Sequence, residues 1–353
     1  MEIDASRNYG IDLLRIISMF GVCILHTLGK GLNIDSFEMN QTGYSLFWTL
    51  EILAYNSVDV FALISGYTAK NEKKNYEKIV KMWFQVFFYS FILSVILSLT
   101  GILPSKLETL DYIRYMFPLT CGIYWYFTSY FLLFIISPFI NKIIFELDEK
   151  TCRRIFVLIF FFFVSLGFFF DSFKTEDGYS PIWLIGLYCL GLLAKRIKLL
   201  GKTDTSLLIV LGITLITITI VSKVILDSDL IVSYISPFLV SYAIIEVIVF
   251  SRIKLNGNGL LKITPFVFGV YLFHLNPVVW DNISLIKYLP YIQSNILYGC
   301  AIVIIYALSL FLIGLVIDYI RNMLFKLIKI NTISKKIISG ITRIADSTGE
   351  KLN

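Results

Sequence analysis

The stretch IFVLIFFFFVSLGFFF, from Ile155 to Phe170, has only one serine and one glycine among large apolar side chains. A second stretch, LLIVLGITLITITIV from Leu207 to Val221, has nothing more polar than threonine. Apolar segments of roughly 20 residues cross bilayers as helices, because lipid offers no hydrogen-bond partner to the backbone. Similar segments recur along all 353 residues, of which only 16% are charged. The sequence therefore predicts an all-α integral membrane protein.

The apolar segments predict about ten transmembrane helices. We expect them at residues 9–30, 45–69, 79–101, 122–144, 154–171, 181–197, 205–225, 231–250, 260–281 and 294–319. With a cytoplasmic N-terminus, 24 of the 31 Lys and Arg residues fall in inside segments and six in outside segments. The remaining one, Arg15, lies in the first helix. Since cytoplasmic loops are rich in Lys and Arg, this count favours ten helices with both termini in the cytoplasm.

The chain divides into residues 1–325, a single membrane domain, and residues 326–353, a basic cytoplasmic tail. Two interpretations of this tail stay open. It forms an amphipathic helix on the anionic inner leaflet, or it is a partly disordered segment. The basic residues lie in loops, so we expect membrane lipids and no nucleic acid as partners. Five scattered cysteines and two histidines predict no metal site.

Ionisable side chains inside a span are costly, and the first helix carries three of them: Asp12, Arg15 and His26. Arg15 and His26 are eleven residues apart, which places them within about 20° of each other and about 16 Å apart along a helix. Asp12 lies one turn from Arg15 on the same side. This face should point into a bundle interior or a wet cavity, although Asp12 and Arg15 also fit an interfacial ion pair.

The second span carries Glu51 and Asp59, which lie about 80° apart around a helix. Asp59 is followed by Ser65 and Gly66, and this pair allows close approach of either a neighbouring helix or a ligand. The carboxylates are candidates for a functional site because lipid does not tolerate them.

Two further segments combine polar and aromatic residues. The first contains Trp125, Tyr126 and Tyr130, which fit both an aromatic belt at the outer interface and a sugar-binding site. The second is FGVYLFHLNPVVW, in which Asn276 and the following proline interrupt the helix just after His274. Freed backbone carbonyls next to an imidazole suggest a site as readily as a packing feature.

These segments together resemble the acyltransferase-3 family of bacterial membrane acyltransferases. The first helix is similar to the opening motif of the family, an arginine followed by ten residues and a histidine, here Arg15 and His26. VDVFALISGY is similar to the second block, with Asp59, Ser65 and Gly66. The resemblance runs from about residue 8 to residue 320.

Two later blocks extend the resemblance. IYWYFTSYFLLFIISPFIN is similar to a block rich in Trp, Tyr and Phe, here with Trp125, Tyr130 and Asn141. GVYLFH is similar to the late Tyr-Leu-x-His block, with Tyr271 and His274. One departure is the loop of residues 70–81, which is lysine-rich where many members have arginines, so its contacts with donor phosphates are open.

The resemblance implies transfer of an acyl group, usually acetyl, from cytoplasmic acyl-CoA to a hydroxyl of a cell-surface or lipid-linked glycan. Acetyl-CoA or another acyl-CoA is then the donor substrate, with no permanently bound cofactor, and the location is the bacterial cytoplasmic membrane. A sugar hydroxyl needs a general base, and histidine suits that role. The expected catalytic residues are His26 as base, Arg15 for the donor phosphates or a carboxylate, and Glu51 or Asp59 to orient the imidazole.

The remaining candidates are expected to bind substrate, and Tyr271 and His274 to contact the acceptor or the oxyanion. These candidates are Asp12, Ser65, Trp125, Tyr126, Tyr130, Asn141, Tyr271, His274 and Asn276. The sequence has no Gly-x-Ser-x-Gly motif, so direct transfer or an acyl-histidine is expected. The alternative function is a transporter or flippase of glycan intermediates, because intramembrane charges and a broken helix also suit transport.

Overall fold

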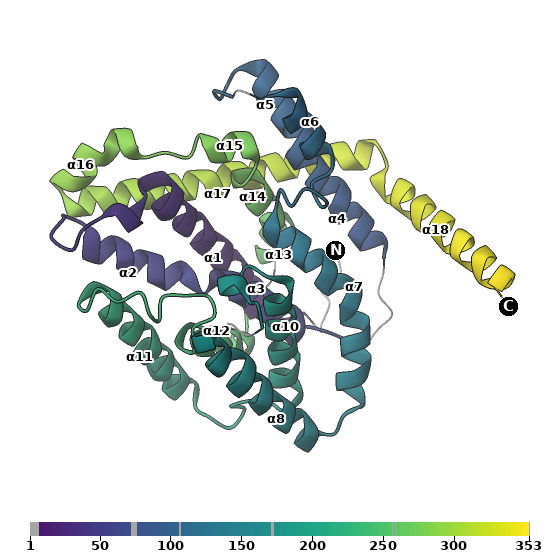
Figure 1. Cartoon of the computed structure of the whole chain (residues 1–353), viewed down its shortest axis with the longest axis horizontal. Helices are drawn as coiled ribbons and strands as arrows, with labels where there is room; N and C mark the ends of the chain where they lie inside the picture. Colours follow the sequence, from purple (N-terminus) through teal and green to yellow (C-terminus); the bar gives the residue numbers. More distant parts are fainter. Residues whose placement is uncertain are drawn as a thin grey trace.

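The structure, a computed structural model, describes residues 7–71, 76–105, 107–170, 173–255, 257 and 259–352, with side chains up to residue 344. The described residues form helices and connecting loops without a β-strand (Figure 1). The predicted all-helical class is therefore confirmed.

The described residues up to 196 form ten α-helices and five π or 3-10 segments. They are α1 (Tyr9–His26), η1 (Thr27–Leu32), η2 (Ile34–Ser36), α2 (Tyr44–Tyr55), α3 (Ser57–Tyr67), α4 (Glu77–Phe87), η3 (Phe88–Leu93), α5 (Ser94–Thr100), α6 (Thr109–Met116), α7 (Trp125–Glu146), α8 (Glu149–Leu158), η4 (Ile159–Leu166), α9 (Gly167–Phe170), η5 (Glu176–Gly178) and α10 (Pro181–Arg196).

The described residues after 196 form eight α-helices and two 3-10 segments. They are α11 (Thr205–Val224), α12 (Pro237–Arg252), α13 (Leu260–Ile263), η6 (Thr264–Phe266), α14 (Val267–His274), α15 (Pro277–Asp281), η7 (Ile286–Tyr288), α16 (Leu289–Ser294), α17 (Ile296–Leu327) and α18 (Ile330–Leu352).

Seven helices in the described part of the chain are long and apolar enough to cross a membrane. They cover Tyr9–Leu32, Tyr44–Tyr67, Glu77–Thr100, Trp125–Glu146, Glu149–Phe170, Thr205–Val224 and Ile296–Leu327. The pair Leu260–His274 and Pro277–Ser294 would be an eighth, and it is bent by 58° at its break. The chain is therefore a multi-pass membrane protein.

The prediction of ten spans depends on two short helices. α10 and α12 have 16 residues each, fewer than the roughly 20 of a typical span. Each begins with a proline, Pro181 and Pro237, which is favoured at the first helical position. This explains why α12 starts six residues after the predicted start at 231. The number ten and the side of each terminus stay predictions.

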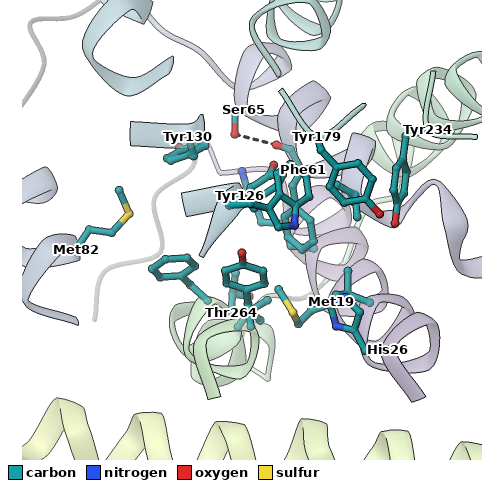
Figure 2. A pocket seen from close by; sticks show the side chains of 17 residues that line it. Met19, His26, Phe61, Ser65, Met82, Tyr126, Tyr130, Tyr179, Tyr234 and Thr264 are labelled. Carbon is teal, nitrogen blue, oxygen red and sulfur yellow. Dashed lines mark hydrogen bonds between the residues drawn. The ribbon is translucent and has the colours of Figure 1, made fainter. Parts of the chain in front are cut away.

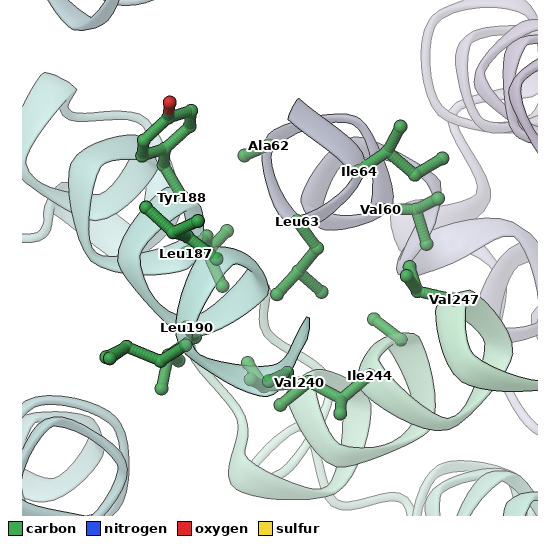
Figure 3. Close-up of a cluster of buried hydrophobic side chains, with 14 of the residues drawn as sticks. Val60, Ala62, Leu63, Ile64, Leu187, Tyr188, Leu190, Val240, Ile244 and Val247 are labelled. Atoms are coloured by element: carbon green, nitrogen blue, oxygen red, sulfur yellow. The ribbon is translucent and has the colours of Figure 1, made fainter. Parts of the chain in front are cut away.

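The largest buried cluster joins α3, α10 and α12 (Figure 3). Figure 3 shows Leu63 of α3 between Leu187 of α10 and Val240 of α12. Gly66 of α3 lies against the backbone of α10, and Gly191 of α10 lies against the backbone of α3. A side chain at either glycine would meet a carbonyl oxygen, so the close approach expected of the Ser-Gly pair is used for helix packing.

A second buried cluster joins α1, α7, α14 and α17 with η3. It includes Cys23, Tyr89, Phe127 and Leu272, all fully buried. α1 contacts α3 of the first cluster and α14 of the second. α1 thus lies between the two clusters, and the space that they leave beside it forms the candidate site.

Candidate functional site

A cavity of about 340 Å³ lies between α1, α3, α7 and α14 (Figure 2). α3 contributes Val58, Phe61 and Ser65, which are three and four residues apart. α14 contributes Val267 and Tyr271, which are four residues apart. Residues at this spacing share one face of a helix. Each of these helices therefore presents a single face to the cavity.

The wall contributed by α1 consists of Arg15, Met19, Val22 and His26. Their spacing of four, three and four residues repeats the periodicity of a helix face. Arg15 and His26 therefore line one cavity, about three turns apart. The expectation that this face points into the bundle is confirmed.

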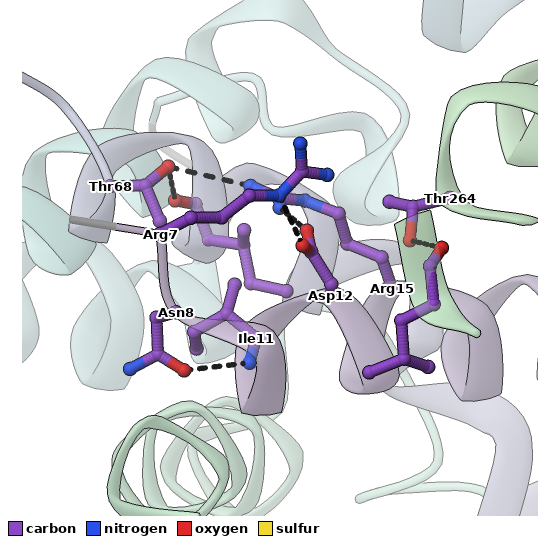
Figure 4. Close-up of polar contacts among 9 residues, drawn as sticks. Arg7, Asn8, Ile11, Asp12, Arg15, Thr68 and Thr264 are labelled. Atoms are coloured by element: carbon purple, nitrogen blue, oxygen red, sulfur yellow. Dashed lines mark hydrogen bonds and ion pairs between the residues drawn. The ribbon is translucent and has the colours of Figure 1, made fainter. Parts of the chain in front are cut away.

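Arg15 is held in place by an ion pair beside the cavity (Figure 4). Its Nη1 donates to Oδ1 of Asp12 at 2.7 Å, and its Nη2 lies 3.5 Å from the hydroxyl oxygen of Thr68. Arg7 donates to the other oxygen of Asp12 at 2.6 Å. Asp12 is only 1% exposed, and two guanidinium groups compensate the cost of burying its charge. Asp12 does not line the cavity itself, so it positions Arg15.

The two histidines of the chain meet at the other end of this α1 face. Nδ1 of His26 lies 2.8 Å from Nε2 of His274. Nδ1 of His274 lies 2.6 Å from the carbonyl oxygen of Val270, one turn earlier in α14. His274 is completely buried. The contact joins residues 248 positions apart, and no sequence pattern indicates that they pair.

The hydrogen bonds assign the protons of this pair. A carbonyl oxygen only accepts, so Nδ1 of His274 must carry a proton and donate it to Val270. The Nε2 of a neutral His274 is then unprotonated and accepts from Nδ1 of His26. A neutral His26 in this tautomer has its lone pair on Nε2. This nitrogen is the one left to act on a group in the cavity.

Trp280 of α15 packs against the same ring. Its ring centroid lies 5.0 Å from that of His26 in an edge-on arrangement, and the centroid of His274 lies 4.9 Å away. Two aromatic neighbours and one hydrogen bond therefore limit the orientation of the His26 imidazole. Such support holds a functional side chain in one geometry.

Aromatic side chains cover another wall of the cavity. Tyr126 and Tyr130 of α7 stack at 6.4 Å, and Trp125 lies 4.7 Å from Tyr179, measured between ring centroids. The ring centroid of Tyr234 lies 5.4 Å from that of Tyr179. Figure 2 shows Tyr179 and Tyr234 side by side at one edge of the group. The predicted trio of α7 thus lines the cavity, half-buried, next to two tyrosines from loops.

Two phenol groups in the cavity wall are buried, and their O–H groups donate to no described residue. They are the hydroxyls of Tyr126 and Tyr271. Buried polar groups are normally paired, and an unpaired one is a candidate for contact with a ligand. Ser65, which also lines the cavity, donates its hydroxyl to the carbonyl oxygen of Phe61 at 2.8 Å.

Four predicted substrate-binding residues do not line the cavity, namely Asp12, Asn141, His274 and Asn276, and the two asparagines hold helices together. Asn276 caps α15 with its side-chain oxygen and donates to the carbonyl oxygen of Tyr89 at 2.6 Å. Asn141 accepts from the hydroxyl of Tyr188 at 2.6 Å and donates to the carbonyl oxygen of Lys70 at 3.4 Å. The backbone N–H groups that follow the break after His274 are therefore paired within the protein.

The two carboxylates expected to orient His26 also lie outside the cavity. Oδ1 of Asp59 accepts from the indole nitrogen of Trp183 at 3.0 Å, and Oδ2 has no partner among the described residues. Glu51 has one buried oxygen, Oε2, that is likewise unpartnered. Neither carboxylate is hydrogen-bonded to His26, whose neighbour is His274. The residue that orients His26 is therefore a second histidine and not the expected carboxylate.

Several lining residues escaped the sequence analysis. Met82 of α4, Thr264 of η6 and Phe268 of α14 also line the cavity, and Tyr179 and Tyr234 line it from loops. Thr264, Phe268 and Tyr271 are four and three residues apart, which is the spacing of one helix face. This spacing could have predicted that the first two lie beside the motif tyrosine. No such spacing predicts the loop tyrosines, because their positions depend on tertiary packing.

Comparison with known proteins identifies a family for nearly the whole chain. The model of the acyltransferase-3 family, described as an acyltransferase domain, matches residues 8–317. No significant match was found among curated proteins or among solved structures. The matched range includes every residue of α1, α3, α7 and α14, which line the cavity. The chain therefore belongs to the acyltransferase-3 family of membrane acyltransferases.

Proposed function

We propose that the chain is an O-acyltransferase of the bacterial cytoplasmic membrane. It moves an acyl group, acetyl in the simplest case, from cytoplasmic acyl-CoA to a hydroxyl of a cell-surface or lipid-linked glycan. The single observation that carries the proposal is that Arg15 and His26 line one cavity on one helix face. A cation at one end suits an anionic donor, and an imidazole at the other suits a hydroxyl acceptor.

In this mechanism, Nε2 of His26 takes the proton of the acceptor hydroxyl. The oxygen attacks the thioester carbonyl, and the carbonyl oxygen becomes negatively charged. When the tetrahedral intermediate collapses, the carbon–sulfur bond breaks and the CoA thiolate leaves with the proton held by His26. The histidine returns to its starting tautomer, and no covalent acyl-enzyme is needed.

The hydroxyl of Tyr271 is our candidate for the oxyanion donor. It lines the cavity, is buried and donates no hydrogen bond to a described residue. Its ring lies 6.2 Å from that of His274, centroid to centroid, and 6.1 Å from that of Tyr126. A donor that is already desolvated and oriented stabilises developing charge strongly. Tyr126 offers a second hydroxyl at the same wall.

The aromatic wall of Trp125, Tyr126, Tyr179 and Tyr234 is our candidate for the acceptor subsite. Rings of this kind offer apolar faces to the C–H groups of a sugar and hydroxyls to its oxygens. Glu51 and Asp59 lie outside this wall. In the proposal, they support the helices that carry the site and do not touch the reacting atoms.

Acyl transfer can be tested with the purified protein in lipid nanodiscs. The protein is incubated with isotopically labelled acetyl-CoA and the lipid-linked glycan fraction of the producing cells, and label in the glycan is measured. We expect transfer by the wild type and none by His26→Ala. Thermal unfolding shows whether the variant is folded, so a loss of transfer can be assigned to chemistry.

The purified protein reconstituted into sealed vesicles tests the transporter alternative. The bent pair formed by Leu260–His274 and Pro277–Ser294 resembles the broken helices of transporters. In sealed vesicles, movement of unmodified glycan without label transfer would favour transport and contradict the acyltransferase proposal. Label transfer that persists in folded His26→Ala would contradict the role of the histidine.

A further inference from the structure

A row of aromatic rings leads out of the cavity on the side away from Met82. Trp125, Tyr179 and Tyr234 line the cavity, and their ring centroids are 4.7 and 5.4 Å apart in that order. Figure 2 shows Tyr179 and Tyr234 at the edge of the cavity opposite Met82. The row continues to Tyr55 of α2, whose ring centroid lies 4.6 Å from that of Tyr234. Tyr55 does not line the cavity, so the row extends beyond it.

The far end of this row is open to a ligand. Tyr179 is 47% exposed although it lines the cavity. Glu51 and Tyr55 are both half-buried on α2. A molecule that occupies the cavity can therefore continue along Tyr179 towards α2 without displacing a buried side chain.

Glu51 lies beside the far end of the row. It is four residues before Tyr55, so the two side chains share one face of α2. Glu51 is also close enough to Tyr179 and Tyr234 to interact with them electrostatically. A molecule bound along these rings would thus have the carboxyl group of Glu51 within its reach.

The carboxyl group of Glu51 lacks a hydrogen-bond donor. Its Oε2 is buried and has no partner among the described residues. None of the ion pairs among the described residues includes Glu51, and its charged neighbour, Asp35, is also acidic. A buried carboxylate oxygen without a donor is costly, and a hydroxyl of a bound molecule would supply the missing donor.

The loop that carries Tyr179 has an unfavourable backbone conformation. Lys174, Glu176 and Asp177 have φ angles of 50°, 52° and 53°, in the left-handed region that residues other than glycine rarely adopt. Such residues cost free energy and cluster at active sites and ligand clamps, where the geometry itself is needed. The conformation of this loop therefore supports a binding role for Tyr179.

We propose that the far end of this row and Glu51 form a second acceptor subsite, which binds the sugar unit next to the one that is acylated. The acylated unit lies in the cavity. The next unit lies along Tyr179 and Tyr55, with its C–H groups against the rings and a hydroxyl donated to Oε2 of Glu51. Glu51 thus has a role besides supporting its helix, and it does not touch the reacting atoms. This inference rests on the proposed function and adds that the acceptor has at least two sugar units.

The test compares acceptors of one and two sugar units. They are released from the lipid-linked glycan fraction by mild acid and separated by length, and transfer of labelled acetyl to each is measured in nanodiscs. For the wild type, we expect kcat/KM to be about ten- to a hundredfold higher with two units, because the second unit adds a hydrogen bond to a charged group and a ring contact. In Glu51→Gln, which keeps the size of the side chain and loses its charge, this preference should fall about tenfold.

Glu38→Gln is the matched control. Glu38 is exposed and does not line the cavity, and its replacement removes the same charge, so this variant should keep the preference of the wild type. Tyr55→Leu is a second test variant, which removes the last ring of the row and should lower the preference about threefold or more. Thermal unfolding shows whether each variant is folded. Equal losses of kcat/KM with both acceptors in Glu51→Gln would mean that Glu51 only supports its helix, and would overturn the inference.

Two further outcomes separate this inference from the proposed function. A wild type that transfers acetyl equally well to one and two units overturns the second subsite and leaves the acyltransferase proposal standing. Binding of the two-unit acceptor, measured by calorimetry, covers the opposite case. If the wild type transfers no acetyl but binds this acceptor about tenfold more tightly than Glu51→Gln does, the subsite stands and the acyltransferase proposal fails. A wild type that neither binds the acceptor nor transfers acetyl contradicts both.

Discussion

Replacing His274 by leucine removes the acceptor that fixes the proton of His26. In the structure, Nε2 of His274 accepts from Nδ1 of His26 because its own Nδ1 proton is donated to Val270. Without this acceptor, the His26 ring can carry its proton on Nε2, and that tautomer cannot act as a base towards the cavity. We expect His274→Leu to lower kcat and to leave the KM for acetyl-CoA nearly unchanged.

The expected decrease of kcat in His274→Leu lies between two limits. A net hydrogen bond contributes about 1 kcal/mol, so losing tautomer control alone lowers kcat about fivefold. If the ring also leaves its working position, the loss approaches the full contribution of a general base, about 10²–10⁴-fold. Trp280 still packs against His26 in the variant and keeps part of its orientation. The expected loss therefore lies between these limits.

His274→Gln is the matched control. Its amide oxygen can accept from His26, and its amide nitrogen can donate to the carbonyl of Val270, so both bonds can be replaced. The assay measures transfer of labelled acetyl to the lipid-linked glycan fraction, with folding checked by thermal unfolding. Folded leucine and glutamine variants with equal kcat would refute the idea that His274 acts through hydrogen bonding. Wild-type kcat in the leucine variant would refute any role in catalysis.

Three other predictions follow from the same structure. Arg15→Lys keeps the charge but loses the planar donor group, so we expect a higher KM for acetyl-CoA with little change in kcat, and an unchanged KM would exclude donor contact. Gly66→Ala should destabilise the protein by about 1–3 kcal/mol because a new methyl group meets the backbone of α10, whereas Gly29→Ala, with open space around it, should have little effect in thermal unfolding. A hydrogen bond from Tyr44 lowers the pKa of the Asp227 carboxyl below its ordinary value of 3.8, so its contribution to stability is present above that pH and is lost as the pH falls through the lower value. Tyr44→Phe should therefore lower Tm at neutral pH, with the difference from wild type shrinking below about pH 3.8, and a pH-independent difference would contradict this.

The sequence was sufficient to predict what depends on local periodicity. Arg15 and His26 were expected on one face because helix geometry fixes the angle between residues eleven positions apart. The same reasoning placed Asp12 beside Arg15, and the structure has the ion pair. Most apolar stretches were located for the same reason, since each span needs its own run of apolar residues.

The sequence was insufficient where contacts join distant parts of the chain. His26 lies next to His274, and neither of the expected carboxylate partners, Glu51 and Asp59, is hydrogen-bonded to it. No pattern within α1 or α14 indicates which residue of another helix will lie opposite. The same limit applies to the loop residue Tyr179, whose place in the cavity wall follows from packing.

The break after His274 shows how a correct signal can have a different physical meaning. Asn276 and the proline after it indicated either a ligand site or a packing feature, and in the structure the asparagine caps α15. The bend still has a consequence for the site. In a straight helix, residues 274 and 280 would point about 120° apart and lie about 9 Å apart along the axis. The helices on either side of the break are bent by 58°, and both His274 and Trp280 reach the ring of His26. The break therefore matters because it brings two side chains of one segment to one imidazole, and a straightened helix would leave His26 with only one of them.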